Sequence, residues 1–149
     1  MPVPHIEALS RDRFFLVAMA AGPVVWLVIL FTPLLPLAGR TFSLSQFLLL
    51  VVLFPVLEEL AFRGLIQGYL SSFDVFKKRW LKLSVANWLT SLLFTAAHFI
   101  YNPIVLASLV FLPSLIFGAL RDRYQSTIPS IILHCFYNLG FFLTVMLMK

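Results

Sequence analysis

The chain of 149 residues is short of charge and of cysteine. Only 11% of its residues are charged, while 61% are apolar, and the mean hydropathy is +0.99. A soluble domain of this length has too little interior to bury so much apolar surface, so a water-soluble globule is excluded. The one cysteine, Cys135, excludes an internal disulfide framework and a multi-cysteine metal site.

Apolar runs account for most of the chain. A membrane crossing needs about 20 apolar residues, so the length allows a single bundle with little left for a soluble domain. The sequence therefore predicts an all-α, polytopic transmembrane helix bundle of about five spans, forming one membrane-embedded domain over residues 1–149. The predicted spans are residues 14–37, 44–70, 83–100, 104–120 and 128–148.

The basic residues predict the orientation of this bundle. Five spans place the amino terminus and the loops 71–82 and 121–127 on one side of the membrane. Eight Lys and Arg residues fall on that side, and only Arg40 and Lys149 fall on the other. By the positive-inside rule the amino terminus is cytoplasmic. Because the positive charge lies in short clusters between apolar runs, it does not indicate binding to nucleic acid.

Three charged residues interrupt the second run. An ionised side chain at mid-bilayer costs at least about 2.5 kcal/mol, so such residues are functional candidates. Glu59 and Arg63 are four residues apart on one helix face, which predicts an intrahelical ion pair. Glu58 is rotated by about 100° from Glu59 and lacks that partner. One interpretation is that all three residues form a single structural polar cluster. The other is that Glu59 and Arg63 are structural, which leaves Glu58 available for chemistry.

Polar residues also recur at helical spacing in two later runs. The stripe Asn87, Ser91, Thr95 and His98 is predicted to face the bundle interior. In the last run His134 and Asn138 are four residues apart on one face, and each offers a hydrogen-bond donor. The helical rise of about 1.5 Å per residue gives the depth of each candidate group. Glu58, His98, His134 and Asn138 all lie roughly 15 to 21 Å from the cytoplasmic ends of their spans, which places them in one layer.

A carboxylate, two imidazoles and an amide in a dry cavity can hydrolyse a peptide bond. The reaction needs a base for water, donors for the oxyanion and a proton for the leaving amine. Burial raises the proton affinity of a carboxyl such as Glu58 toward the range that suits this task. His98 is expected to hold the same water, while His134 and Asn138 are expected to donate to the oxyanion.

The same residues form three motifs of a known family. Residues 58–63 match EExxxR, residues 94–98 match FxxxH, and residues 134–138 match HxxxN. In this order, on separate spans, they resemble the CPBP family of CAAX prenyl endopeptidases and bacteriocin-processing or immunity proteins, also called glutamic-type intramembrane proteases. The resemblance covers about residues 55–138 and implies a metal-independent protease without a cofactor.

The resemblance also implies a role for each motif residue. Glu58 is the implied general base and His98 its partner in activating water, while His134 and Asn138 form the oxyanion site. The supporting residues are Glu59, Arg63 and Phe94. Family members usually have more helices before the first motif than the one found here. We therefore expect a short membrane-embedded peptide substrate, such as a carboxyl-terminal sorting tag, in a bacterial cytoplasmic membrane.

Other functions remain open from the residues alone. Glu58, His98 and His134 have the chemistry of three zinc ligands, although the sequence lacks the HExxH motif. A non-catalytic immunity or scaffold protein would keep the same polar bundle to bind a partner. Cys135 points about 100° away from His134, so it is a poor nucleophile candidate. A transporter with inverted repeats is disfavoured because the sequence has no repeated half.

Overall fold

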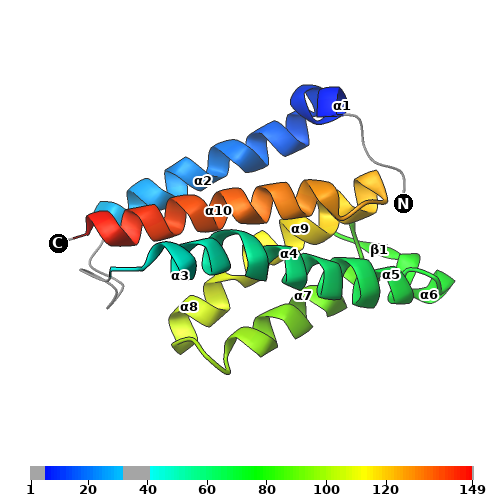
Figure 1. Cartoon of the computed structure of the whole chain (residues 1–149). Coiled ribbons are helices and arrows are strands. Elements are labelled where there is room, and N and C mark those ends of the chain that lie inside the picture. The colour runs from blue at the N-terminus through cyan, green and yellow to red at the C-terminus, as the bar shows by residue number, and fades with distance from the viewer. Residues whose placement is uncertain (1–5, 32–40, 149) are drawn as a thin grey trace. The chain divides into compact units, whose positions relative to one another are not determined.

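A computed structural model describes residues 6–31 and 41–148 of the chain. Within the described residues the chain is helical apart from loops and one short β-hairpin, which confirms the predicted all-α class (Figure 1). It forms two compact units. Unit 1 is Glu58–Ser130, and unit 2 consists of the described residues of His5–Leu57 and Ile131–Lys149.

The elements follow one another with short connections. The segments that precede the hairpin are α1 (Ile6–Arg11), α2 (Arg13–Phe31), α3 (Leu44–Leu48), the π-helix η1 (Leu49–Leu53), α4 (Phe54–Glu59), the π-helix η2 (Leu60–Gln67), α5 (Gly68–Leu70) and α6 (Asp74–Lys77). The hairpin is β1 (Arg79–Trp80) and β2 (Leu83–Ser84). The helices that follow are α7 (Val85–His98), α8 (Ile104–Leu109), α9 (Phe111–Tyr124) and α10 (Ile128–Leu147).

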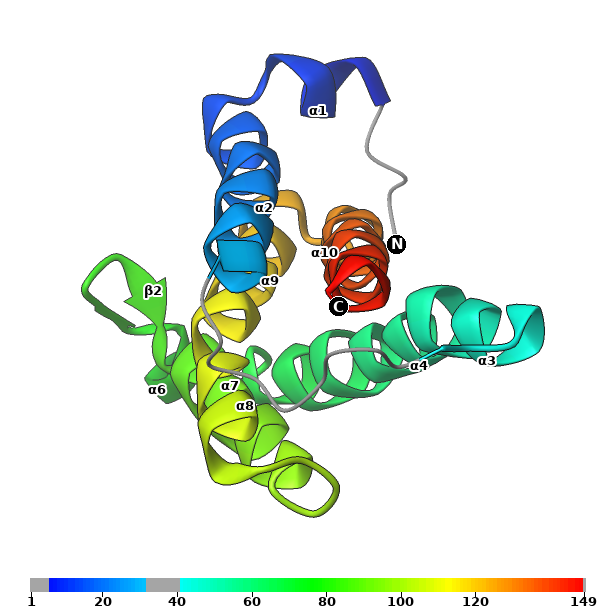
Figure 2. The same cartoon turned by 90° about the vertical axis from the view of Figure 1, so that its left-hand side faces the viewer.

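Unit 1 is built on two helices, α7 and α9, which lie side by side (Figure 2). They approach closely at Gly118, where an added Cβ would overlap the carboxamide of Asn87. Asn87 Nδ2 donates to the Leu115 carbonyl at 3.0 Å, which fixes the two helices at this point. The π-helix η2 packs against both α7 and α9. These contacts determine the positions of the polar side chains described below.

Unit 2 contains α2 and most of α10, and small residues bring these helices together. An added Cβ at Gly140 would overlap the Trp26 indole, and the rings of Trp26 and Phe136 lie 4.9 Å apart. Tyr137 Oη donates to the Ala18 carbonyl at 2.6 Å. The same helix α10 therefore carries His134 and Asn138 on a scaffold that is fixed by its neighbours in unit 2.

Among the described residues, three helical segments are long and apolar enough to cross a membrane, namely Arg13–Phe31, Ile104–Tyr124 and Ile128–Leu147. The predicted spans 44–70 and 83–100 do not appear as single long α-helices. The first is continuously helical but alternates between α and π geometry, and the second is the 14-residue helix α7. A helix of that length extends about 21 Å, less than the hydrocarbon core of a bilayer.

Several predicted boundaries differ from the structure. The predicted end of the first span at Leu37 lies outside the described residues. The third run begins in a β-strand, and α7 starts only after Ser84, whose hydroxyl caps it by accepting from the Asn87 N–H. The fourth run was expected to stop at Leu120, but α9 continues to Tyr124 because the polar residues of that turn bond to neighbouring elements of unit 1.

Candidate functional site

Glu59 and Arg63 form the predicted intrahelical ion pair. Arg63 Nε lies 3.4 Å from Glu59 Oε2, and both side chains are fully buried. The four-residue spacing places them on one face of the helical segment. Removing either partner would leave an uncompensated charge in a dry environment, at a cost of about 3 to 5 kcal/mol. The pair therefore allows the first motif to remain charged inside the protein.

The Arg63 guanidinium also ties η2 to the two main helices of unit 1. Its Nη2 donates to the Ser114 carbonyl at 3.0 Å and to the Ser114 hydroxyl at 2.7 Å. The guanidinium carbon lies 5.4 Å from the centre of the Phe94 ring, within the range of a cation–π contact. A planar group with several donors can satisfy these contacts together, whereas a lysine ammonium cannot.

Phe94 connects the ion pair to His98. Its side chain is buried, its ring meets Phe62 edge-on at 5.0 Å, and the His98 ring lies 4.5 Å away. One aromatic residue therefore contacts the guanidinium of the first motif and the imidazole of the second. This contact gives Phe94 a physical reason to stand four residues before the histidine.

The tautomer of His98 follows from its hydrogen bond. His98 Nδ1 lies 2.9 Å from the Phe94 carbonyl oxygen. Because a carbonyl can only accept, Nδ1 carries the proton in this contact. Neutral His98 then has its lone pair on Nε2. The imidazole is half-buried and is arranged to accept a hydrogen bond through that nitrogen.

Glu58 lies in α4, immediately before Glu59. It is half-buried, whereas Glu59 is fully buried. The difference in exposure follows from the rotation of about 100° between adjacent helix positions. The π-helix η2 begins one residue after Glu59. Such wide turns are frequent at functional sites.

The predicted polar stripe on α7 faces the interior. Asn87 and Ser91 are fully buried, and Thr95 is buried. Ser91 Oγ donates to Asn87 Oδ1 at 3.0 Å, and Thr95 Oγ1 donates to the Ser91 carbonyl at 2.9 Å. His98 continues the stripe at its half-buried end.

Sequence reasoning missed a second polar cluster, which lies beyond Arg63 along the helix, on the side away from Glu59. Gln67 Nε2 donates to Asp122 Oδ1 at 2.8 Å and to the Gly118 carbonyl at 2.9 Å. Asp122 Oδ2 accepts from Ser84 Oγ at 2.5 Å, and Arg121 Nε donates to the Arg63 carbonyl at 3.3 Å. The available signal was spacing, because Gln67 stands four residues after Arg63 and eight after Glu59 on one face.

Asn138 has a defined partner in unit 2. Its Nδ2 donates to the Leu50 carbonyl at 2.9 Å. In η1 the Phe54 N–H bonds to the Leu49 carbonyl, as the i→i+5 pattern requires. The next donor in that pattern is Pro55, which has no N–H. The Asn138 amide thus supplies the hydrogen bond that proline withholds, and its second N–H remains for another acceptor.

The candidate residues therefore fall into two groups. Unit 1 brings Glu59, Arg63, Phe94 and His98 into one chain of contacts and also holds Glu58. Unit 2 holds Asn138 and His134, whose side chain is buried. Within each unit, the described His, Cys, Asp and Glu side chains form no group of three that could hold a metal ion.

Comparison with known proteins bears on the same region. Residues 40–140 match the model of the family described as type II CAAX prenyl endopeptidase Rce1-like. The match spans all three motifs and more than half of the chain. Neither the curated proteins nor the solved structures gave a match.

Proposed function

The chain belongs to the Rce1-like family of type II CAAX prenyl endopeptidases, and on that premise we propose that it cleaves a membrane-associated protein by glutamate-activated water. The family is one of proteases, and three apolar helices fit an integral membrane protein. The proposed substrate is a peptide segment near the terminus of its protein, such as a carboxyl-terminal sorting tag. The proposed location is a bacterial cytoplasmic membrane, which the chain crosses several times.

The hydrogen bond between His98 and the Phe94 carbonyl is the observation that supports this proposal most directly. It leaves Nε2 as an acceptor for one hydrogen of a water molecule. The ion pair occupies Glu59 with Arg63. Glu58 is then the carboxylate that we propose as general base. It accepts the other hydrogen of that water, the one that is not bonded to His98, as a proton.

The proposed reaction proceeds in two steps. Glu58 accepts a proton while the water oxygen attacks the scissile carbonyl carbon, which forms a tetrahedral oxyanion. His134 and the second N–H of Asn138 donate to that oxyanion. Glu58 then returns its proton to the leaving amine, the C–N bond breaks, and a carboxylic acid and an amine are released. Such a base contributes about 10² to 10⁴ in rate, and one oxyanion donor about 10² to 10³.

The test compares membrane proteomes of cells that carry the wild type or Glu58→Gln. We expect one or a few proteins to keep a terminal segment in the variant that wild-type cells remove. Asp74→Asn is the matched control because it neutralises an exposed acid of the same unit. Cleavage should persist in this control. If Glu58→Gln processes the same proteins as the wild type, the proposal fails and a scaffold role is favoured.

A second measurement separates this mechanism from zinc catalysis. Once a substrate is known, the purified protein is assayed after prolonged treatment with a strong chelator. A glutamate mechanism predicts unchanged cleavage, together with a loss of about 10² to 10⁴ in Glu58→Gln. Loss of activity that added zinc restores would identify a metalloprotease instead.

A further inference from the structure

The β-hairpin of unit 1 is firmly attached to α7. Its strands pair antiparallel, and the Val85 N–H donates to the Lys78 carbonyl at 2.9 Å just beyond the pair. Trp88 Nε1 donates to the Trp80 carbonyl at 3.1 Å, and the two indole rings lie 4.8 Å apart. These contacts preorganise the hairpin, so its exposed side chains are presented in a fixed arrangement.

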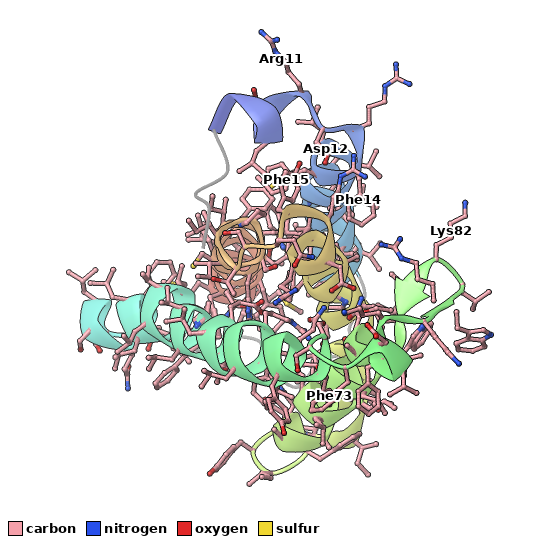
Figure 3. The ribbon with its side chains drawn as sticks, turned by 90° about the vertical axis from the view of Figure 1, so that its right-hand side faces the viewer. Arg11, Asp12, Phe14, Phe15, Phe73 and Lys82 are labelled. Atoms are coloured by element: carbon pink, nitrogen blue, oxygen red, sulfur yellow. The ribbon has the colours of Figure 1, made fainter. Side chains whose placement is uncertain are left out.

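The turn of this hairpin is made of residues that are poor at forming it. Leu81 and Lys82 have φ values of 51° and 67°. Two consecutive left-handed residues define a type I′ turn, which strongly favours Asn-Gly. A leucine in this conformation is an outlier, and residues held in such sparsely populated conformations cluster at functional sites. Leu81 is 69% exposed, and Figure 3 shows Lys82 extending away from the ribbon.

The side chains around the turn combine positive charge with apolar surface. Lys77 is paired with Asp74 at 2.7 Å, and this hydrogen bond and charge hold the pKa of the Asp74 carboxyl below its ordinary value. The two opposite charges of this pair offset each other. The remaining cations are Lys78, Arg79 and Lys82, all exposed. They flank Leu81 and Trp80, which is 61% exposed.

The hairpin also stands at the end of a candidate membrane span. Ser84 of β2 donates through Oγ to Asp122 Oδ2. Asp122 lies in the last turn of α9, at the carboxyl end of the apolar segment Ile104–Tyr124. The end of such a segment lies at the level of the lipid headgroups, where tryptophan and basic side chains concentrate.

We propose that the hairpin tip, defined as residues 78–82, binds the headgroups of anionic lipids. The three cations contact lipid phosphates, while Leu81 and Trp80 enter the boundary of the acyl chains. Each basic residue near a membrane surface strengthens attraction to anionic lipid by about fivefold. An acidic soluble peptide would use the charges but would leave both apolar side chains in water, so the composition favours lipid.

The test uses fluorescence quenching by brominated lipids in reconstituted vesicles. The contribution of Trp80 is obtained as the difference between the wild type and Trp80→Phe. At equal mole fractions, we expect brominated phosphatidylglycerol to quench Trp80 several-fold more strongly than brominated phosphatidylcholine. The excess should shrink with added salt, because exposed charges are screened. Equal quenching by the two lipids would overturn the proposal.

A tip variant and a matched control show whether the excess quenching by the anionic lipid depends on the cations of the tip. The triple change Lys78→Gln, Arg79→Gln and Lys82→Gln should bring the quenching ratio to about one. The matched control Arg11→Gln with Arg13→Gln removes two exposed cations of unit 2 and should leave the ratio unchanged. An unchanged ratio in the triple variant, or an equal loss in the control, contradicts the proposal.

A third variant keeps the hairpin while replacing two residues of its tip. Leu81→Asn with Lys82→Gly installs the preferred residues of a type I′ turn. We expect the thermal midpoint to hold or rise while the excess quenching falls. If brominated phosphatidylglycerol gives no excess quenching while a soluble acidic peptide changes the Trp80 fluorescence of the wild type, the occupant is a peptide and the lipid proposal is wrong.

Discussion

Replacing Asn138 by alanine separates its structural contribution from its proposed role in catalysis. The change removes the donor to the Leu50 carbonyl. Interhelical hydrogen bonds in membrane proteins average about 0.6 kcal/mol, and an unsatisfied buried acceptor costs about 1 to 3 kcal/mol. Because Leu50 is half-buried, we expect a loss of about 1 to 2 kcal/mol in the free energy of unfolding, measured by denaturant titration in mixed micelles.

The decisive comparison is the cost of Asn138→Ala in the wild type and in a Pro55→Ala background. Pro55→Ala supplies the backbone N–H that the Leu50 carbonyl lacks in the π pattern. In that background Asn138→Ala should cost less than about 0.5 kcal/mol, which gives a coupling energy of about 1 kcal/mol for the pair. The cycle cancels the cost of the cavity left by the buried proline. Pro23→Ala, on α2 of the same unit, is the matched background and should leave the cost of Asn138→Ala unchanged.

Activity measured in the same variants tests the second role. If Asn138 also donates to the oxyanion, the Pro55→Ala, Asn138→Ala double variant recovers stability but stays about 10² to 10³ below the Pro55→Ala protein in kcat. If stability and activity recover together, Asn138 acts only through the helix. If the cost of Asn138→Ala is equal in the wild-type and Pro55→Ala backgrounds, the argument from the missing proline N–H is refuted.

Two further predictions concern unit 1. Arg63→Lys keeps the charge but loses the forked contacts to Ser114, so the unfolding free energy should fall by about 2 to 4 kcal/mol in micelle titrations, and an unchanged value would contradict the bridging role. Gly118→Ala forces a methyl group into the Asn87 carboxamide and should cost about 1 to 3 kcal/mol by the same assay. In Gly64→Ala the new Cβ would lie 3.7 Å from the Thr127 methyl group, an ordinary van der Waals contact, so this control should be tolerated. Equal costs at both glycines would show that the close helix approach at Gly118 does not set the cost of the substitution.

Local spacing allowed several features of the site to be predicted from the sequence. The Glu59–Arg63 pair follows from a four-residue separation, which the structure confirms. The buried face of α7 follows from the same periodicity in Asn87, Ser91 and Thr95. These predictions succeed because an unpaired polar group is costly in an apolar environment, so its neighbours in sequence reveal which way it must face.

Tertiary contacts account for what the sequence did not predict. Asp122 appeared to mark the end of a span, but its carboxylate accepts from Gln67 and Ser84, which are distant in sequence. The hairpin at residues 79–84 was hidden because Leu81 and Lys82 are not turn-forming residues. The π geometry before Pro55 was likewise hidden, since the donor that completes it comes from α10.

The four-residue spacing within the first two motifs has a bonding reason that is independent of catalysis. In the first motif it sets the ion pair, and in the second it allows His98 to contact both the ring and the carbonyl of Phe94. In the third it places Asn138 one turn from His134, with its amide on the Leu50 carbonyl. Loss of activity on changing Arg63 or Phe94 is therefore expected from lost positioning and does not identify a catalytic residue. Glu58→Gln, in which shape is retained and a proton acceptor is removed, tests the chemical step itself.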